Sequence, residues 1–256
     1  MSTLLAFAKK EITERIRSVR LFVLLGLAVL LGVLNFLLTW VTPLLFEMLA
    51  DPLAASGLEI GEITVSALDS WLQFFSNISI GLIVFLILEG RTFTGEYSSG
   101  TLILSLTKGL ARFKVVIAKA SVMTLLWTVC FWLCFAVTYV GNEFLWDNSV
   151  AQNLALSGIL WWLFGVWAIS MVVLFSTAFR SGALALLGPG GIIILSSIIE
   201  LFPKIDRFMP SYLMNGTALV YGTSSPSDFL PSTLITLALT VVCFAVSVPI
   251  FNKKQL

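Results

Sequence analysis

The segment between Glu89 and Arg112 contains the residues of this chain whose spacing comes nearest to a site for chemistry. Gly95 and Gly100 have the spacing of the two glycines in a phosphate-binding loop, in which backbone N–H groups cradle phosphate oxygens. Thr101 stands where such a loop needs its lysine, and no buried strand precedes the segment. We therefore expect no ATP binding by this chain through such a loop.

Other catalytic chemistry is limited by composition. The 256 residues include no histidine, which excludes His-ligated zinc, His general bases and Ser/His or Cys/His nucleophile pairs. Cys130 and Cys134 lie four residues apart inside an apolar run, where small packing residues are the more ordinary interpretation than a metal or redox pair. The apolar runs contain no clustered carboxylates or Ser/Lys pair, which disfavours an intramembrane enzyme. We predict no catalytic residue, metal site or cofactor site on this chain.

The composition is that of a membrane protein. Hydrophobic residues make up 58% of the chain and charged residues only 11%, whereas a soluble domain has about a quarter charged. Six charge-free runs are each long enough to cross the roughly 30 Å hydrocarbon core once as a helix. The sequence thus predicts an all-α integral membrane protein with one transmembrane domain over residues 1–256. Its six spans are expected at about 21–46, 70–89, 114–141, 152–179, 182–201 and 229–251.

The basic residues give the orientation. Of the 15 lysines and arginines, 13 fall in residues 1–20, in the region 91–119, at Arg180 and at the C-terminus, and all of these lie on one side of the predicted spans. Lys and Arg near span ends remain on the cytosolic side during insertion. Both termini are therefore predicted to be cytosolic, together with the long loop 90–112.

Two segments outside the spans are expected to lie at the membrane surface. In residues 3–20 apolar residues such as Leu5, Ile12 and Ile16 recur at helical spacing among charged ones, which is typical of an amphipathic interfacial helix. Residues 203–228 are rich in Pro, Gly, Asn and Ser, whose backbone and polar groups cannot be left facing lipid. This second segment is predicted to be a re-entrant stretch between the fifth and sixth spans.

The fifth span contains Gly188, Pro189, Gly190 and Gly191 near its middle. Proline removes a backbone hydrogen bond and glycine lowers helix stability, so a kink or a break is expected. The motif is either a hinge or cavity wall, or a tolerated kink where helices approach closely. The sequence leaves both interpretations open.

The loop residues Glu96, Gly100-Thr101-Leu102, Arg112 and Lys119 form a recognisable pattern. It resembles that of the membrane subunit of ATP-binding-cassette transporters of the type-2 permease family. Members commonly show an acidic residue, Gly-Thr-Leu, an apolar run, a turn, a basic residue and then Gly-Lys. Gly109, where proline is usual, and Ala118, where glycine is usual, depart from the pattern, as does Thr107-Lys108 at the turn. The layout of nearly the whole chain fits the same family.

This resemblance implies an assembly of two permease chains, identical or different, with two nucleotide-binding ATPase subunits that carry ATP and Mg²⁺. It also implies a multi-pass location in a bacterial cell membrane, in contact with membrane lipid and with no nucleic acid. Residues 94–106 would form the coupling helix that contacts the ATPase. The implied partner-coupling residues are Glu96, Tyr97, Gly100, Thr101, Leu102 and Arg112.

Two functions of different classes remain. The resemblance implies an ATP-driven exporter of an amphipathic or hydrophobic substrate, such as a peptide, a lipid-like molecule or a drug. The alternative is a secondary transporter or channel without an ATPase partner, which would usually place ionisable residues at mid-membrane. The six runs are charge-free, with Glu89 and Glu200 at span ends, and this disfavours ion coupling.

Overall fold

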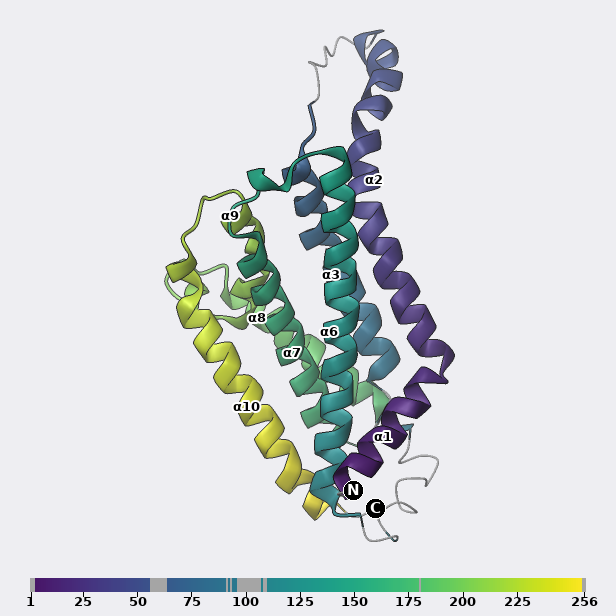
Figure 1. Cartoon of the computed structure of the whole chain (residues 1–256). Helices are drawn as coiled ribbons and strands as arrows, with labels where there is room; N and C mark the ends of the chain where they lie inside the picture. The colour runs from purple at the N-terminus through teal and green to yellow at the C-terminus, as the bar shows by residue number, and fades with distance from the viewer. Residues whose placement is uncertain are drawn as a thin grey trace.

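The computed structural model describes residues 3–55, 64–90, 92, 94–95, 107, 110–179 and 181–254. Within these ranges the regular structure is helical throughout, as a long bundle with smaller helical turns at its ends (Figure 1). Six helices are long and apolar enough to cross a membrane. The prediction of an all-α fold with six spans is confirmed.

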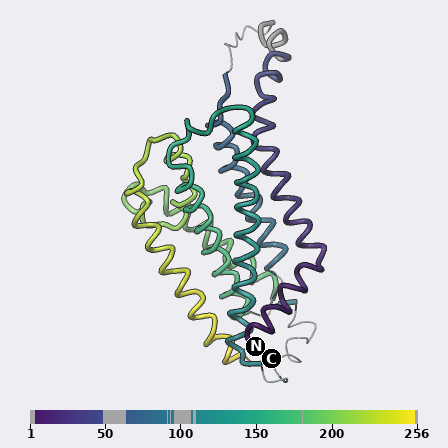
Figure 2. Tube along the Cα trace, viewed as in Figure 1, coloured from purple at the N-terminus to yellow at the C-terminus, as the bar shows by residue number. Residues whose placement is uncertain are grey.

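The helices follow one another up and down the bundle. A short helix α1 precedes the six spanning helices, and both chain termini lie at one end of the bundle, which we call the terminal end (Figure 2). The short helix α1 covers Thr3–Ile16. The six long helices are α2 (Val19–Ala55), α3 (Ala67–Glu89), α6 (Arg112–Leu145), α7 (Leu154–Ala178), α8 (Gly182–Ile199) and α10 (Leu230–Lys253).

Helix α7 is the centre of the fold. In its most apolar stretch 78% of the residues are buried inside the protein, against 17% in α8 and 22% in α10. α7 packs against α6, α8 and α10, while α6 also packs against α1, α2 and α3. The outer helices therefore present most of their apolar surface outward, as expected for helices that face lipid.

Helices α6 and α7 interlock through aromatic side chains. The indole Nε1 of Trp127 donates to the carbonyl oxygen of Trp162 at 3.1 Å, and Nε1 of Trp162 donates to the Thr128 hydroxyl at 3.0 Å. A Cβ at Gly165 would lie 2.3 Å from atoms of the Trp127 ring. Glycine at position 165 is thus what lets the Trp127 ring lie directly on the α7 backbone.

Helices α2, α3 and α6 are joined by a buried polar chain. Asn77 Nδ2 donates to Asn35 Oδ1 at 2.9 Å, and Asn35 Nδ2 donates to the Thr138 hydroxyl at 3.0 Å. A polar side chain in an apolar region needs such partners, because an unmade hydrogen bond there is costly. These hydrogen bonds fix how the three helices face one another.

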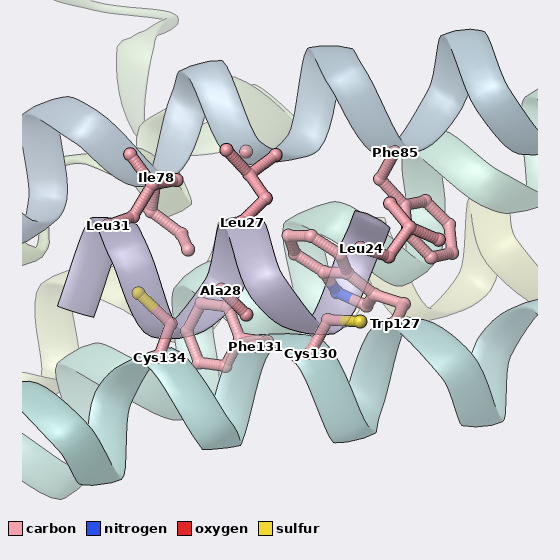
Figure 3. A pocket seen from close by; sticks show the side chains of 11 residues that line it. Leu24, Leu27, Ala28, Leu31, Ile78, Phe85, Trp127, Cys130, Phe131 and Cys134 are labelled. Atoms are coloured by element: carbon pink, nitrogen blue, oxygen red, sulfur yellow. The ribbon is translucent and has the colours of Figure 1, made fainter. Parts of the chain in front are cut away.

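A small cavity lies between α2, α3 and α6, beside these hydrogen-bonded side chains (Figure 3). Its volume is about 20 Å³, and apolar side chains such as Leu24, Ile78 and Phe131 form most of its wall together with Cys130 and Cys134. Both cysteines are buried, as packing residues would be. A cavity with so few polar partners is expected to stay dry.

The stretch 203–228 forms short helical turns at the end of the bundle opposite the terminal end (Figure 1). They pack among α3, α7 and α10, with Leu213, Leu219 and Val220 buried. The Ser157 hydroxyl of α7 donates to the carbonyl oxygen of Gly216 at 3.1 Å. The turns are η2 (Asp206–Phe208), η3 (Pro210–Met214), α9 (Gly216–Val220) and η4 (Pro226–Phe229). Helical turns and tertiary contacts thus provide the hydrogen-bond partners that lipid could not offer to the backbone of this stretch. Its re-entrant placement in the membrane stays a prediction.

Candidate coupling site at the terminal end

The loop 90–112 joins α3 to α6 at the terminal end, which is the predicted cytosolic face. Of the six predicted partner-coupling residues, only Arg112 lies among the described residues. The other five, Glu96, Tyr97, Gly100, Thr101 and Leu102, lie outside them, so their roles stay predictions, as does the coupling helix over 94–106. What the structure does describe is how both ends of the loop are attached to the bundle.

A buried ion pair holds the first end of the loop. Glu89, the last residue of α3, is 1% exposed and lies 2.8 Å from the guanidinium of Arg15 in α1. Nη2 of Arg15 also donates to the hydroxyl of Thr92 at 2.6 Å, and this hydroxyl is within hydrogen-bond reach of the Glu89 carboxylate and carbonyl. One arginine of α1 therefore clamps both the end of α3 and the start of the loop.

A second buried ion pair holds the far end of the loop. Lys119, two turns into α6, is 1% exposed, and its Nζ donates to Oε2 of Glu11 at 3.0 Å. The Glu11 side chain is 3% exposed. The half-exposed Lys10 lies 3.3 Å from the other carboxylate oxygen, Oε1 of Glu11. Because an isolated charge is very costly in an apolar environment, the burial of Lys119 depends on Glu11, and that of Glu11 depends on these two cations.

Both pairs come from one face of α1. Phe7, Glu11 and Arg15 recur every four residues and therefore share the helix face that packs against the bundle. The apolar side chains Leu5 and Ile16 are 58% and 55% exposed on other faces. A helix that turns charges inward and leucine and isoleucine outward is suited to lie against lipid, which supports the predicted interfacial placement.

The remaining acid of α1 is in a different situation. Glu14 is exposed and lies 2.9 Å from Lys10, one turn earlier on the same helix. The hydrogen bond from Lys10 lowers the pKa of the Glu14 carboxyl below its usual value. An exposed pair of this kind contributes about 0 to 1 kcal/mol, so Glu14 provides a reference for the two buried pairs.

Arg112 caps the C-terminus of α10 at the same end of the bundle. Its Nη1 lies within hydrogen-bond distance of the carbonyl oxygens of Phe251, Asn252 and Lys254, at the C-terminus of α10. Nζ of Lys254 in turn donates to the carbonyl oxygen of Thr177, in the last turn of α7, at 3.0 Å and to that of Phe179, just after α7, at 2.8 Å. Cations at helix C-termini satisfy orphan carbonyls and interact favourably with the helix dipole. Arg112 thus attaches the start of α6 to α10, whatever it also contributes to partner docking.

Helix α8 begins against the first part of the loop. A Cβ added to Gly90 would lie 2.2 Å from Leu186 of α8, and one added to Gly182 would lie 3.4 Å from the Thr94 hydroxyl. The backbone at the end of α3 and the first turns of α8 are therefore in close contact. A movement of the loop is expected to reach α8 directly.

The Gly188-Pro189-Gly190-Gly191 motif lies within α8, which runs as one helix from Gly182 to Ile199 with Pro189 inside it. A Cβ at Gly188 would lie 2.1 Å from the Phe175 ring of α7, so this glycine permits close packing. Nothing lies within 4 Å of a Cβ added at Gly190 or Gly191. The span is not broken, and close packing explains only the first glycine of the motif.

We expect Gly190→Ala and Gly191→Ala each to stabilise the protein. Alanine at a helix-interior position without a clash is favoured over glycine by up to about 1 kcal/mol. The measurement is the midpoint of thermal unfolding in detergent, with Gly188→Ala as the control that should lower it through the Phe175 contact. A transport rate that falls while stability rises would identify a hinge, whereas an unchanged rate would identify a tolerated kink.

Sequence reasoning missed the four residues of the buried pairs as a group. The sequence identified Lys119 as part of the family pattern and Glu89 as the end of a span. It identified Glu11 and Arg15 only as parts of an amphipathic helix. The available signal was that Glu11 and Arg15 are four residues apart and have opposite charges to Lys119 and Glu89. That complementarity is visible only once the three helices are known to meet.

The charged side chains at this end join helices to one another around the loop. Among the described residues no group of three or more Cys, Asp or Glu side chains is placed to hold a metal ion. The charged side chains brought together here are instead paired with one another or cap helices. They join α1, α3, α6, α7 and α10 around the two ends of one loop.

Comparison with known proteins assigns the chain to a family. No curated protein matches the chain. The model of one family, described as ABC-2 family transporter protein, matches residues 5–256. This match includes α1 from its third residue on, the loop 90–112 and all six spanning helices. The chain therefore belongs to the ABC-2 family of transporter membrane proteins.

Proposed function

We propose that this chain is the permease subunit of an ATP-driven exporter, and that a separate nucleotide-binding subunit docks on the loop 90–112. In this proposal two permease chains form the pathway, and the ATPase subunits carry ATP and Mg²⁺. The substrate is amphipathic or hydrophobic, such as a peptide, a lipid-like molecule or a drug. The assembly lies in a bacterial cell membrane with the terminal end facing the cytosol.

The attachment of the loop is the observation that carries this proposal. Arg15 clamps the first end of the loop, Lys119 is paired two turns beyond its second end, and Arg112 caps α10 at the junction. Buried pairs and caps resist separation, since breaking one leaves an uncompensated charge. A subunit that pushes on the loop would therefore move α1, α3 and α6 as one body, as rigid-body switching requires.

A secondary transporter or channel receives less support. Such proteins usually keep ionisable groups at mid-membrane, where ions or protons need partners. The buried charged residues described here, Glu11, Glu89 and Lys119, lie at or near the terminal ends of their helices instead. The polar groups of the central chain, Asn35 and Thr138, are neutral and bonded to one another.

We expect Glu96→Arg to reduce the recovery of the ATPase subunit in copurification and to lower substrate-stimulated ATP hydrolysis. The family pattern places Glu96 in the docking segment, and losing one partner of a desolvated interfacial pair typically costs about 2 to 5 kcal/mol. The chain alone should hydrolyse no ATP. The measurement is the ratio of the two subunits after affinity purification, together with the ATPase rate in proteoliposomes.

Glu14→Arg is the matched control, because Glu14 is an exposed acid at the same end with an ordinary surface partner. It should leave both readouts nearly unchanged. If Glu96→Arg behaves like Glu14→Arg, Glu96 is a solvated charge and the docking segment lies elsewhere. ATP turnover by the purified chain alone would contradict the proposal that a separate subunit hydrolyses ATP.

A further inference from the structure

A groove between α6 and α10 has no place in the coupling site. Its volume is about 520 Å³, and Ala120 and Thr124 of α6 face Phe244 and Val248 of α10 across it. Figure 1 shows α10 leaning away from α6 as the two helices leave the terminal end. Most of the lining is apolar, and two hydroxyls, of Ser121 and Thr124, lie along it. The α6 side is Val116, Ile117, Ala120, Ser121, Thr124 and Leu125.

The depth of the groove matches one leaflet of a bilayer. At about 1.5 Å per helical residue, it begins about 6 Å above Arg112 and continues for about 14 Å, from Val116 to Leu125. Half of a hydrocarbon core is about 15 Å thick. The groove therefore covers the depth that an acyl chain of the leaflet at the terminal end occupies.

Two cationic residues of α6, Arg112 and Lys114, come just before the first residue that lines the groove. Lys114 precedes Ile117 by three residues and Ser121 by seven, so it stands on the same row of α6 as this part of the groove. Arg112 precedes Val116 by four residues. A lysine ammonium has three N–H donors, and an arginine has five, so each can bind a phosphate in addition to a protein partner.

The described acids of this end are already committed to other bases. Glu11 pairs with Lys119 and Lys10, Glu14 with the same Lys10, and Glu89 with Arg15. The mouth of the groove is thus positive at the depth where lipid headgroups begin. Each Lys or Arg near the membrane surface raises the affinity for anionic headgroups about fivefold.

From this combination we infer that the groove binds an anionic phospholipid of the leaflet at the terminal end. One acyl chain lies between α6 and α10, and the phosphate lies against Lys114 and Arg112. A second copy of the chain is the poorer occupant, because a two-fold interface would bring Lys114 close to its own symmetry mate. The acyl-chain part of this site lies outside the proposed docking loop, and only Arg112 is shared between the two.

The experiment uses the purified full chain in nanodiscs with equal amounts of phosphatidylglycerol and phosphatidylcholine. Lipids that stay bound after transfer to detergent are identified and counted by native mass spectrometry. The unmodified chain should retain phosphatidylglycerol preferentially. Lys114→Gln should lower that preference about fivefold, and Lys114→Arg should preserve it.

Ser121→Phe tests the acyl-chain part of the site. Ser121 is exposed on the groove, so phenylalanine fills the groove without entering the core, and retention of the lipid should be lost at unchanged thermal stability. Ala136→Phe is the matched control. Ala136 is also exposed on α6, but it lines a different groove of about 440 Å³ with Phe36 and Phe144, and its substitution should leave phosphatidylglycerol retention intact.

Three results would overturn the inference. Equal retention of the two lipids by the unmodified chain would show no anionic site. Equal losses in Ser121→Phe and Ala136→Phe would mean that the retained lipid is a general annulus. Conversion of a dimer to a monomer by Ser121→Phe, without a change in lipid retention, would assign the groove to a second copy.

Discussion

Lys119→Met is expected to lower the stability of the protein by about 3 to 5 kcal/mol, the usual cost of breaking a buried ion pair. Methionine keeps an unbranched side chain that is one atom shorter, and it removes both the charge and the N–H donors of lysine. Glu11 is 3% exposed and would lose the buried ammonium that lies 3.0 Å from its Oε2, keeping only the half-exposed Lys10 at 3.3 Å from its Oε1. Either the carboxylate stays buried without that partner, or α1 detaches from α6 to let water in. The measurement is the midpoint of thermal unfolding in detergent, which should fall by roughly 10 °C.

The double variant Glu11→Leu, Lys119→Met separates charge from packing. Replacing both members of a buried pair by apolar residues of similar size is often neutral or stabilising, so the double variant should recover most of the loss. Glu14→Gln is the control at an exposed pair on the same helix and should cost less than about 1 kcal/mol. A single variant as stable as this control would show that Lys119 is not buried as described.

The same variants also test the proposed coupling. If the Glu11–Lys119 pair serves only stability, the double variant should transport as well as the unmodified chain. If the pair specifies how α1 sits against α6, the double variant should fold well but couple ATP hydrolysis to transport poorly. Comparing the two variants therefore distinguishes a structural role from a role in force transmission.

The fold was largely predictable because the bilayer imposes a simple rule. A charge-free run of about 20 residues must become a helix, since lipid offers no partner for backbone N–H and C=O groups. The helix bounds were less predictable. α6 starts at Arg112, before the predicted 114, and ends at Leu145, after the predicted 141, because a helix continues past the hydrocarbon core wherever the next residues allow it.

The buried ion pairs could not have been predicted in the same way. Lys119 and Glu89 are far apart in the sequence from Glu11 and Arg15, and no local periodicity indicates which helices meet. In residues 3–20 the apolar stripe led the interpretation, whereas the charged face of the helix makes the specific contacts. Glu96, Tyr97 and their neighbours remain assigned by family pattern alone.

Gly165→Ala is the second substitution with a large expected effect, and it acts in the centre of the bundle. The new Cβ would lie 2.3 Å from Cε2 and Nε1 of Trp127, a distance that real Cβ atoms do not show. Trp127 cannot easily move, because it is 2% exposed, donates to the carbonyl oxygen of Trp162, and packs edge-on against Phe85. Overpacking of this kind costs about 1 to 3 kcal/mol and outweighs the gain in helix propensity of up to about 1 kcal/mol.

The direction of the change in stability distinguishes an effect of side-chain packing from an effect of helix propensity. Gly190→Ala, where nothing lies within 4 Å of the added Cβ, should raise the unfolding midpoint, while Gly165→Ala should lower it. The Trp127→Phe background supplies the second test, because phenylalanine lacks the indole nitrogen that the new Cβ would meet. In that background Gly165→Ala should cost clearly less, giving a coupling energy of roughly 0.5 to 3 kcal/mol between the two positions. If the two substitutions are additive instead, the glycine is not required for the approach of Trp127, and α6 and α7 pack differently from the arrangement described.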